Sequence, residues 1–185
     1  MGTGGRKAEC VMADTGFKTT GAVVSTGTWS AFTTTRINTA DDIRATVSST
    51  SFVAATTNNY SFGLASGVTI DGIEVNAEFS TSSAGAIATL QISLSWDNGT
   101  SYTTTKSDTI TGSTTDKNST FGGAADTWGR SWTDSEFANG TFLVKIEGKN
   151  NTAGQQCRLD FLQIKVYYTV PSTGASGAYY IFMEA

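Results

Sequence analysis

The sequence predicts an all-β protein, an antiparallel β-sandwich of jelly-roll type, on three observations. Threonine and serine are abundant, with 32 and 20 copies among 185 residues, and β-branched threonine fits the pleated, half-exposed surface of a strand. Short segments alternate apolar and polar residues with a period of two, as strands with one wet face do. Turn residues separate these segments, whereas apolar patterns at helical spacing extend over no more than about two turns. Many short strands in such an order indicate a sandwich.

The chain divides into three parts. Residues 1–28 are rich in glycine and weakly patterned, so we expect an extended N-terminal arm. Residues 29–169 carry the strand signals and form the predicted sandwich, whose length suits a single domain. Residues 170–185 begin with a linker around Pro171 and end in an apolar segment of strand length, for which we predict a C-terminal strand.

Three segments give the clearest strands. Apolar residues occupy alternate positions from 70 to 79 and again from 90 to 96. The Asp-Asn-Gly turn at 97–99 then predicts a tight reversal into a return strand at 102–110. The segment 158–169 is apolar on both faces, which indicates a central strand or one covered by a second subunit.

Weaker signals complete the order of elements. Further strands are expected at 43–47, 52–54, 60–64 and 142–147. The polar, glycine-rich residues 111–127 are expected to form a long loop that extends from the body. Thr133 and Glu136 have the spacing of a capping box, which predicts one short helical turn.

Composition excludes several classes of function. The chain has no histidine, so it lacks Ser-His and Cys-His nucleophile pairs and His-ligated zinc or iron sites. A net charge of −4 with 12 lysines and arginines is unfavourable for binding nucleic acid. No apolar run is long enough to span a bilayer. We therefore predict no nucleic-acid or membrane partner, no cofactor, and no catalytic or metal-binding residue.

The N-terminus and the two cysteines bear on the compartment. No apolar run follows the basic pair Arg6-Lys7, so a secretory signal is not expected. Cys10 and Cys157 lie far apart in the sequence, and they could pair only if the fold brought them together. For a protein made in a cytosol, two reduced thiols are the simpler interpretation.

Acidic residues offer only weak enzymatic alternatives. The adjacent acids at 41–42 would point to opposite faces of a strand, and we interpret them as solvated. No loop has the spacing of a local calcium site. A scattered acidic site would have to be built from Asp97, Asn98 and Asp126, and a glycan-cleaving or esterase activity without histidine would depend on Asp126 and Asp134.

Two of the four tryptophans raise a binding alternative. Trp29 opens the predicted sandwich, and Trp96 lies on the apolar face of its strand, where a core position is expected. Trp128 and Trp132 flank a loop-like stretch. They either pin this loop to the sandwich or offer stacking platforms to sugar rings.

Three ordered motifs carry a resemblance to a known family. They are Thr-Ile-Asp-Gly-Ile-Glu-Val at 69–75, Asp-Thr-Trp-Gly-Arg-Ser-Trp at 126–132, and the segment 160–169 that ends in Val-Tyr-Tyr-Thr. Together with Trp29, they resemble β-sandwich modules in structural proteins of tailed phage virions, over residues 28–169. A proline that usually precedes the first motif is replaced by Ala-Ser-Gly at 65–67.

The resemblance implies a structural protein without catalytic chemistry. Its shared residues are scaffold, with Gly72 serving a close turn and Trp128 serving packing. We expect a capsid decoration or cement protein that binds and stabilises the outside of the head, located in the virion after synthesis in the bacterial cytoplasm. The alternative is a tail or fibre protein that binds a host-surface glycan, with Trp128 and Trp132 as the candidate contacts.

The parts outside the module are expected to make the contacts. An arm can lie along another subunit and become ordered there, and an apolar terminal strand can add to a neighbour's sheet. The partners would be the major capsid protein or other virion proteins, and a homo-oligomer is expected, with a trimer favoured. The candidate contact residues are Arg6, Lys7, Phe17, Tyr179, Tyr180 and Phe182.

Overall fold

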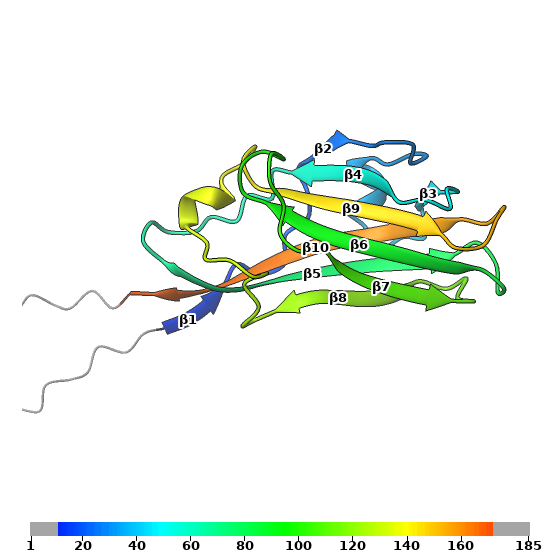
Figure 1. Cartoon of the computed structure of the whole chain (residues 1–185). Coiled ribbons are helices and arrows are strands. Elements are labelled where there is room, and N and C mark those ends of the chain that lie inside the picture. The colour runs from blue at the N-terminus through cyan, green and yellow to red at the C-terminus, as the bar shows by residue number, and fades with distance from the viewer. Residues whose placement is uncertain (1–10, 172–185) are drawn as a thin grey trace, which may run out of the picture.

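A computed structural model describes residues 11–171 and contains two antiparallel sheets packed face to face (Figure 1). The β10 sheet has the order β1-β10-β5-β8, and β3 also pairs with β10; the β9 sheet has the order β2-β4-β9-β6-β7. The elements are β1 Val11–Asp14, β2 Ala22–Ser25, α1 Thr34–Ile37, β3 Ala45–Val47, β4 Val53–Asn58, β5 Thr69–Thr81, β6 Ile87–Ser95, β7 Lys106–Thr111, β8 Lys117–Gly123, η1 Asp134–Phe137, β9 Leu143–Asn150 and β10 Cys157–Val170. The predicted all-β antiparallel sandwich is confirmed.

β5 and β10 are the long central strands of their sheet. Their 13 and 14 residues pair along most of their length. A β-bulge interrupts the register between Leu159 and Phe161, so Leu159 and Leu162 are both buried although they lie three positions apart. β5 pairs with one edge of β10, and β1 and β3 pair with its other edge. The predicted central position of this strand is confirmed, because it has partners along both edges. The bulge gathers its buried apolar residues on one face, whereas the other face is only partly buried and also carries Gln163 and Lys165.

Residues 11–28 belong to the sandwich and do not form the predicted arm. β1 pairs with β10, and β2 pairs with β4 at the edge of the other sheet. Each of these strands has only four residues and is held largely by backbone hydrogen bonds to its neighbour. Such short edge strands leave almost no alternation in the sequence. Residues 1–10 lie outside the described residues.

Two further segments differ from their predictions. Residues 111–127 contain β8, which pairs with β5 and buries Phe121. This edge strand needs only small and apolar residues at alternate positions, so its sequence is hard to distinguish from that of a loop. Residues 60–64 form a loop instead of a strand, since Asn59 and Ser61 have φ values of 61° and 52°. Left-handed backbone of this kind cannot continue a ladder.

The helical turn at 133–136 is confirmed. The Thr133 backbone N–H donates to Glu136 Oε2 at 2.8 Å, and the capping box is complete. This turn, η1, carries Phe137 into a cluster of five rings that closes one end of the sandwich. Contacting pairs within the cluster have ring centroids 5.0–6.1 Å apart; its members are Tyr60, Phe62, Trp132, Phe137 and Phe142. The rings fix the loop at 60–64 and the segment that contains η1 to the sheets.

Gly72 and Gly148 are required by close packing. The family resemblance implied that Gly72 serves a close turn, but Gly72 lies inside β5. A Cβ there would meet the carbonyl oxygen of Gly123 at 2.2 Å. A Cβ at Gly148 would meet the Trp29 ring at 2.3 Å. Trp29 in turn donates its ring N–H to the Val53 carbonyl at 2.8 Å. Trp29 therefore serves the core.

Cys157 is buried at the start of β10. Burial raises the pKa of its thiol to about 12, so the thiol stays protonated at neutral pH. Cys10 lies outside the described residues. Within residues 11–171, no helix has the length and apolar composition needed to cross a membrane.

Candidate functional site

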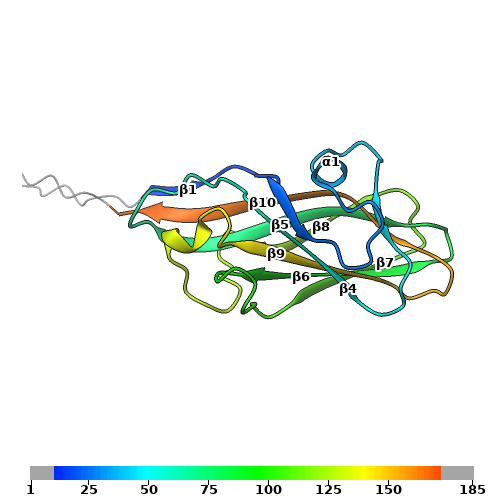
Figure 2. The ribbon, with the colours of Figure 1, turned by 90° about the horizontal axis from the view of Figure 1, so that it is seen from above.

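The chain enters and leaves the described structure at one end of the sandwich. Val11 at the start of β1 pairs with Val170 at the end of β10, and Met12 pairs with Thr169. Figures 1 and 2 show these two strand ends side by side at one end of the sandwich. We call the group Val11, Met12 and Val170 at this strand end the terminal patch; Val11 and Val170 are cross-strand neighbours on one face of the sheet, and Met12 projects from the other face.

The terminal patch is apolar and exposed. Met12 is 70% exposed, and Val11 and Val170 are also among the exposed large apolar side chains. They lie on or beside β1, an edge strand of the β10 sheet. Natural edge strands usually carry charge, proline or a bulge against unwanted pairing. These exposed apolar side chains make this edge a candidate contact surface.

Phe17 is the one candidate contact residue that the structure describes. It follows β1 and is partly exposed, and the Lys165 ammonium lies 4.3 Å from the centre of its ring. The next residue, Lys18, forms a β-bridge with Ile164 of β10. Phe17 therefore lies along the same edge as the terminal patch. The other candidate contacts, Arg6, Lys7, Tyr179, Tyr180 and Phe182, lie outside the described residues.

Trp128 is a packing residue. It is 3% exposed, and its ring N–H donates to the carbonyl oxygen of Ile73 at 2.9 Å. Gly122 provides the space, because a Cβ there would lie 2.6 Å from the ring nitrogen. The implied packing role is thus seen directly, and the ring offers no face to a sugar.

Trp132 is also buried, at 7% exposure, and its ring N–H donates to the Thr127 carbonyl at 2.7 Å. The Arg130 guanidinium lies 4.4 Å from the Trp132 ring centre and 3.9 Å from that of Trp96. Arg130 also pairs with Glu136 at 2.7 Å. The Trp132 and Trp96 rings therefore make cation–π contacts with Arg130 inside the protein. Neither Trp128 nor Trp132 is placed to stack on a glycan, which removes the predicted contacts of that alternative.

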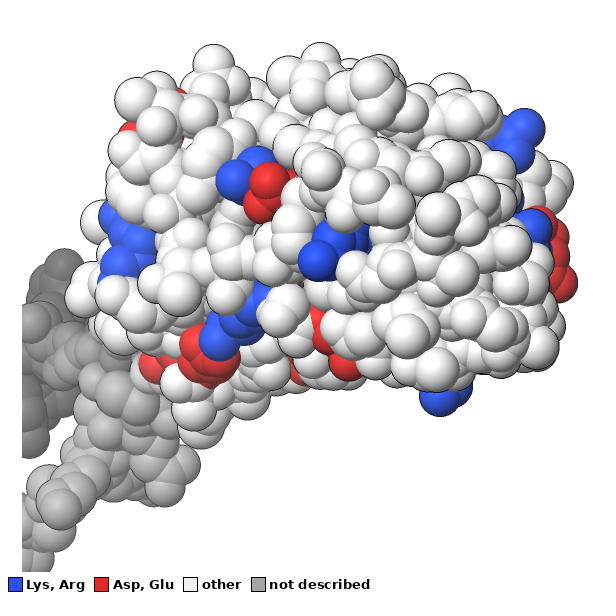
Figure 3. Space-filling model, turned by 45° about the vertical axis from the view of Figure 1, so that its right-hand side comes forward, with Lys and Arg blue, Asp and Glu red and all other residues white. Residues whose placement is uncertain are grey.

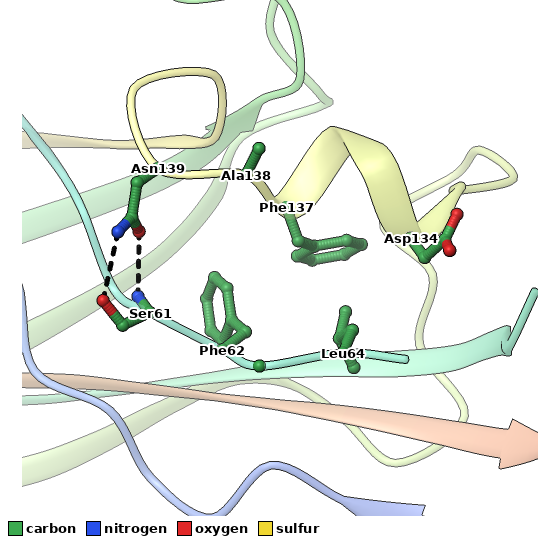
Figure 4. A pocket seen from close by; sticks show the side chains of 8 residues that line it. Ser61, Phe62, Leu64, Asp134, Phe137, Ala138 and Asn139 are labelled. Atoms are coloured by element: carbon green, nitrogen blue, oxygen red, sulfur yellow. Dashed lines mark hydrogen bonds between the residues drawn. The ribbon is translucent and has the colours of Figure 1, made fainter. Parts of the chain in front are cut away.

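A shallow open pocket lies at the end closed by the ring cluster (Figure 4). Its volume is about 370 Å³, with apolar walls from Phe62, Leu64 and Phe137. Asn139 reaches across its rim, accepting from the Ser61 backbone N–H at 3.0 Å and donating to the Ser61 hydroxyl at 3.1 Å. The pocket could not be predicted from the sequence, because the loops that line it meet only through the fold.

The acids considered for catalysis serve the scaffold. Asp126 pairs with Lys106 at 2.7 Å and accepts from the Trp128 backbone N–H at 2.8 Å. Burial acts to raise the pKa of Asp126, but these partners outweigh burial and lower it. The backbone N–H of Gly67 donates to Asp134 at 2.9 Å and lowers the pKa of that carboxyl against partial burial. Both therefore stay ionised at neutral pH and have no proton to donate.

Asp97 caps the tight turn after β6. It accepts from the Ser101 backbone N–H at 2.8 Å and from the Ser95 hydroxyl at 3.0 Å. Among the described residues, the acids close enough to share an ion are instead Asp42, Asp116 and Asp160. The scattered site considered around Asp97 and Asp126 is not the group that the fold assembles.

Charge is sparse and mixed on the face shown in Figure 3, where small groups of basic and acidic residues, several of them adjoining, lie among uncharged surface. Charged residues make up 15% of the sequence. A surface of this kind gives little long-range electrostatic steering. Contacts with a partner would therefore depend on shape and apolar burial.

Comparison with known proteins gives a fold and no family. No family model matches the sequence, and no curated protein matches it. Among solved structures, the chain is similar to a protein described as truncated AlyQ with CBM32 and alginate lyase domains, with a TM-score of 0.51 and 14% identity. The similarity covers 88% of this chain and 35% of that one. It supports the β-sandwich fold alone.

Proposed function

We propose that this chain is a structural, non-enzymatic protein of a tailed phage virion, most simply a decoration or cement subunit on the outside of the capsid. The terminal patch is the observation that carries the proposal. It places exposed apolar side chains at the end where both chain ends leave the sandwich. The ordered motifs at 69–75, 126–132 and 160–169, which resemble phage virion modules, support the same function.

The terminal patch suits attachment to a large symmetric particle. Full burial of a valine or methionine side chain contributes about 1.5–3 kcal/mol, so one patch alone gives modest affinity after the cost of association. Repetition in a homo-oligomer, with the expected trimer as one form, raises the effective affinity without new contacts. The free edge of β1 also offers backbone groups to a partner strand.

The test mixes the purified protein with undecorated capsids and measures co-sedimentation and capsid melting. We expect binding and a higher capsid melting temperature. A Val11→Thr, Met12→Gln double variant keeps side-chain size and removes apolar surface, so its affinity should fall at least about tenfold. Val24→Thr is the matched control, because Val24 is an exposed apolar residue on β2 in the other sheet. Absence of wild-type binding, or equal loss in the control, would contradict the proposal.

Glycan binding on a tail or fibre is the second candidate function, and the pocket is where a glycan would lie. Apolar walls below a polar rim are a common arrangement for a small ligand. Its polar groups already bond within the protein, at Ser61, Asn139 and Asp134, so it has few free partners for sugar hydroxyls. A glycan array tests this candidate: a signal lost in Asn139→Ala would support it, and an array without signal would remove it.

A further inference from the structure

Three carboxylates from distant parts of the chain meet beside β10. Asp42 comes from the loop after α1, Asp116 from the segment before β8, and Asp160 from the β-bulge of β10. One oxygen of each lies within 4.8 Å of one oxygen of the others. α1 packs against β10 on this side of the sheet (Figure 2), which brings its following loop over the bulge.

Asp160 is buried with an unpaired oxygen. It is 2% exposed, and its Oδ1 has no hydrogen-bond partner among residues 11–171. Its Oδ2 accepts one weak bond, from the Asp42 backbone N–H at 3.3 Å. A buried carboxylate oxygen without a partner is costly, and folded proteins normally satisfy such an atom with a donor or a cation.

The charges within the cluster do not balance. Arg44 binds Asp116 through both carboxylate oxygens, with Nε at 3.0 and 2.9 Å, and it also contacts the Asp42 carboxylate. Three carboxylates and one guanidinium leave a net charge of −2. Burial raises the pKa of the nearby Glu78, and the charges of the three aspartates raise it further. Such a rise is expected where negative charge is in excess.

We propose that Asp42, Asp116 and Asp160 bind a divalent cation, with calcium the best fit. A divalent ion would neutralise the remaining charge and give the orphaned Oδ1 of Asp160 a ligand bond. Arg44 does not use every acceptor of the cluster, because its guanidinium donates twice to Asp116 Oδ2 and once to Asp116 Oδ1 but not to Asp160 Oδ1. Oxygen ligands without histidine or thiolate suit calcium, which accepts irregular geometry, better than zinc or magnesium.

The three aspartate side chains range from buried to exposed, so an ion can enter from the exposed side. Asp160 forms the floor, the Asp116 side chain is mostly buried, and the Asp42 side chain is 79% exposed. A bound ion would join the loop after α1 and the segment before β8 to the central strand. It would therefore stabilise the folded state, by a free energy that grows with the logarithm of the ion concentration divided by the dissociation constant.

The experiment removes bound metal with a chelator, dialyses the chelator away, and titrates CaCl₂ or MgCl₂ into the full chain by calorimetry and thermal unfolding. We expect saturable calcium binding and a rise in melting temperature of roughly 5–10 °C at about 100 times the dissociation constant. Magnesium should bind more weakly. Absence of saturable calcium binding would overturn the proposal, and tighter binding of magnesium would overturn the assignment to calcium.

Three variants locate the site. Asp160→Asn and Asp42→Asn should each weaken calcium binding at least tenfold, and Asp42 is exposed enough that its variant should fold normally. Asp71→Asn is the matched control on β5, since its carboxylate accepts from the Thr169 hydroxyl and lies outside the cluster. Calcium binding that survives both cluster variants unchanged, or falls equally in the control, would overturn the assignment to these residues.

Discussion

The two ends of β10 contrast with its middle and with each other. Near its start, Asp160 puts a charge inside the protein, and at its end Val170 leaves an apolar side chain in water beside Met12. Between them, Ile164 and Val166 are fully buried, as the alternating pattern requires. Residues that contradict their environment mark places where a protein meets something else. At one end that is a proposed cation, and at the other a proposed protein partner.

The first prediction tests the middle of β10, where the largest effect is expected. Leu162 is fully buried between the sheets, so Leu162→Ala should lower the free energy of unfolding by about 2–5 kcal/mol. Chemical denaturation measures this change. The loss should be the same with calcium or chelator, because Leu162 makes no contribution to the acidic cluster. A calcium-dependent loss would break the division between the middle of the strand and its start.

The second prediction concerns the start of β10. Burial, reinforced by the Asp116 carboxylate, raises the pKa of Asp160 above its ordinary value although the Asp42 backbone N–H opposes this. A carboxyl with a raised folded-state pKa stabilises folding while it is protonated, and that contribution is lost as the pH rises through the folded pKa. In chelator, Asp160→Asn should therefore gain stability relative to wild type between acid and neutral pH, by about 1–3 kcal/mol.

The measurement is urea denaturation of both proteins from about pH 4 to pH 7, and the readout is the difference between them. Saturating calcium should reverse the difference at neutral pH, since only the wild type retains all three carboxylates. A difference that does not change with pH would show that the ionised Asp160 is already satisfied within the protein. The cation proposal would then lose its main physical reason.

The long strands could be predicted because their signal is local. A period of two over 70–79 needs no knowledge of the partner strand, and the capping box at 133–136 is likewise complete within four residues. β8 and the four-residue strands β1 and β2 were missed because pairing with longer neighbours stabilises them.

The acidic cluster could not be predicted, since Asp42 and Asp160 are 118 positions apart and meet only through the register of β10. One signal was available in the sequence. Asp160 stands between Leu159 and Phe161 within a predicted central strand, and an acid buried in that position requires a partner. Trp128 and Trp132 show a different case, because the sequence allowed two interpretations, a loop pinned to the sandwich or stacking platforms for sugar rings, and only the fold decides between them by burying both rings.

The third prediction concerns the end of β10 and the smallest effect on the isolated protein. The Val11→Thr, Met12→Gln double variant changes exposed side chains that pack on little within the chain, so its free energy of unfolding should stay within about 0.5 kcal/mol of wild type. The same variant should lose capsid binding, because apolar surface there matters only once a partner covers it. Denaturation and capsid co-sedimentation on one preparation measure both quantities. A large loss of stability would show that the terminal patch packs within its own chain, and the contrast between the two ends of β10 would then rest on Asp160 alone.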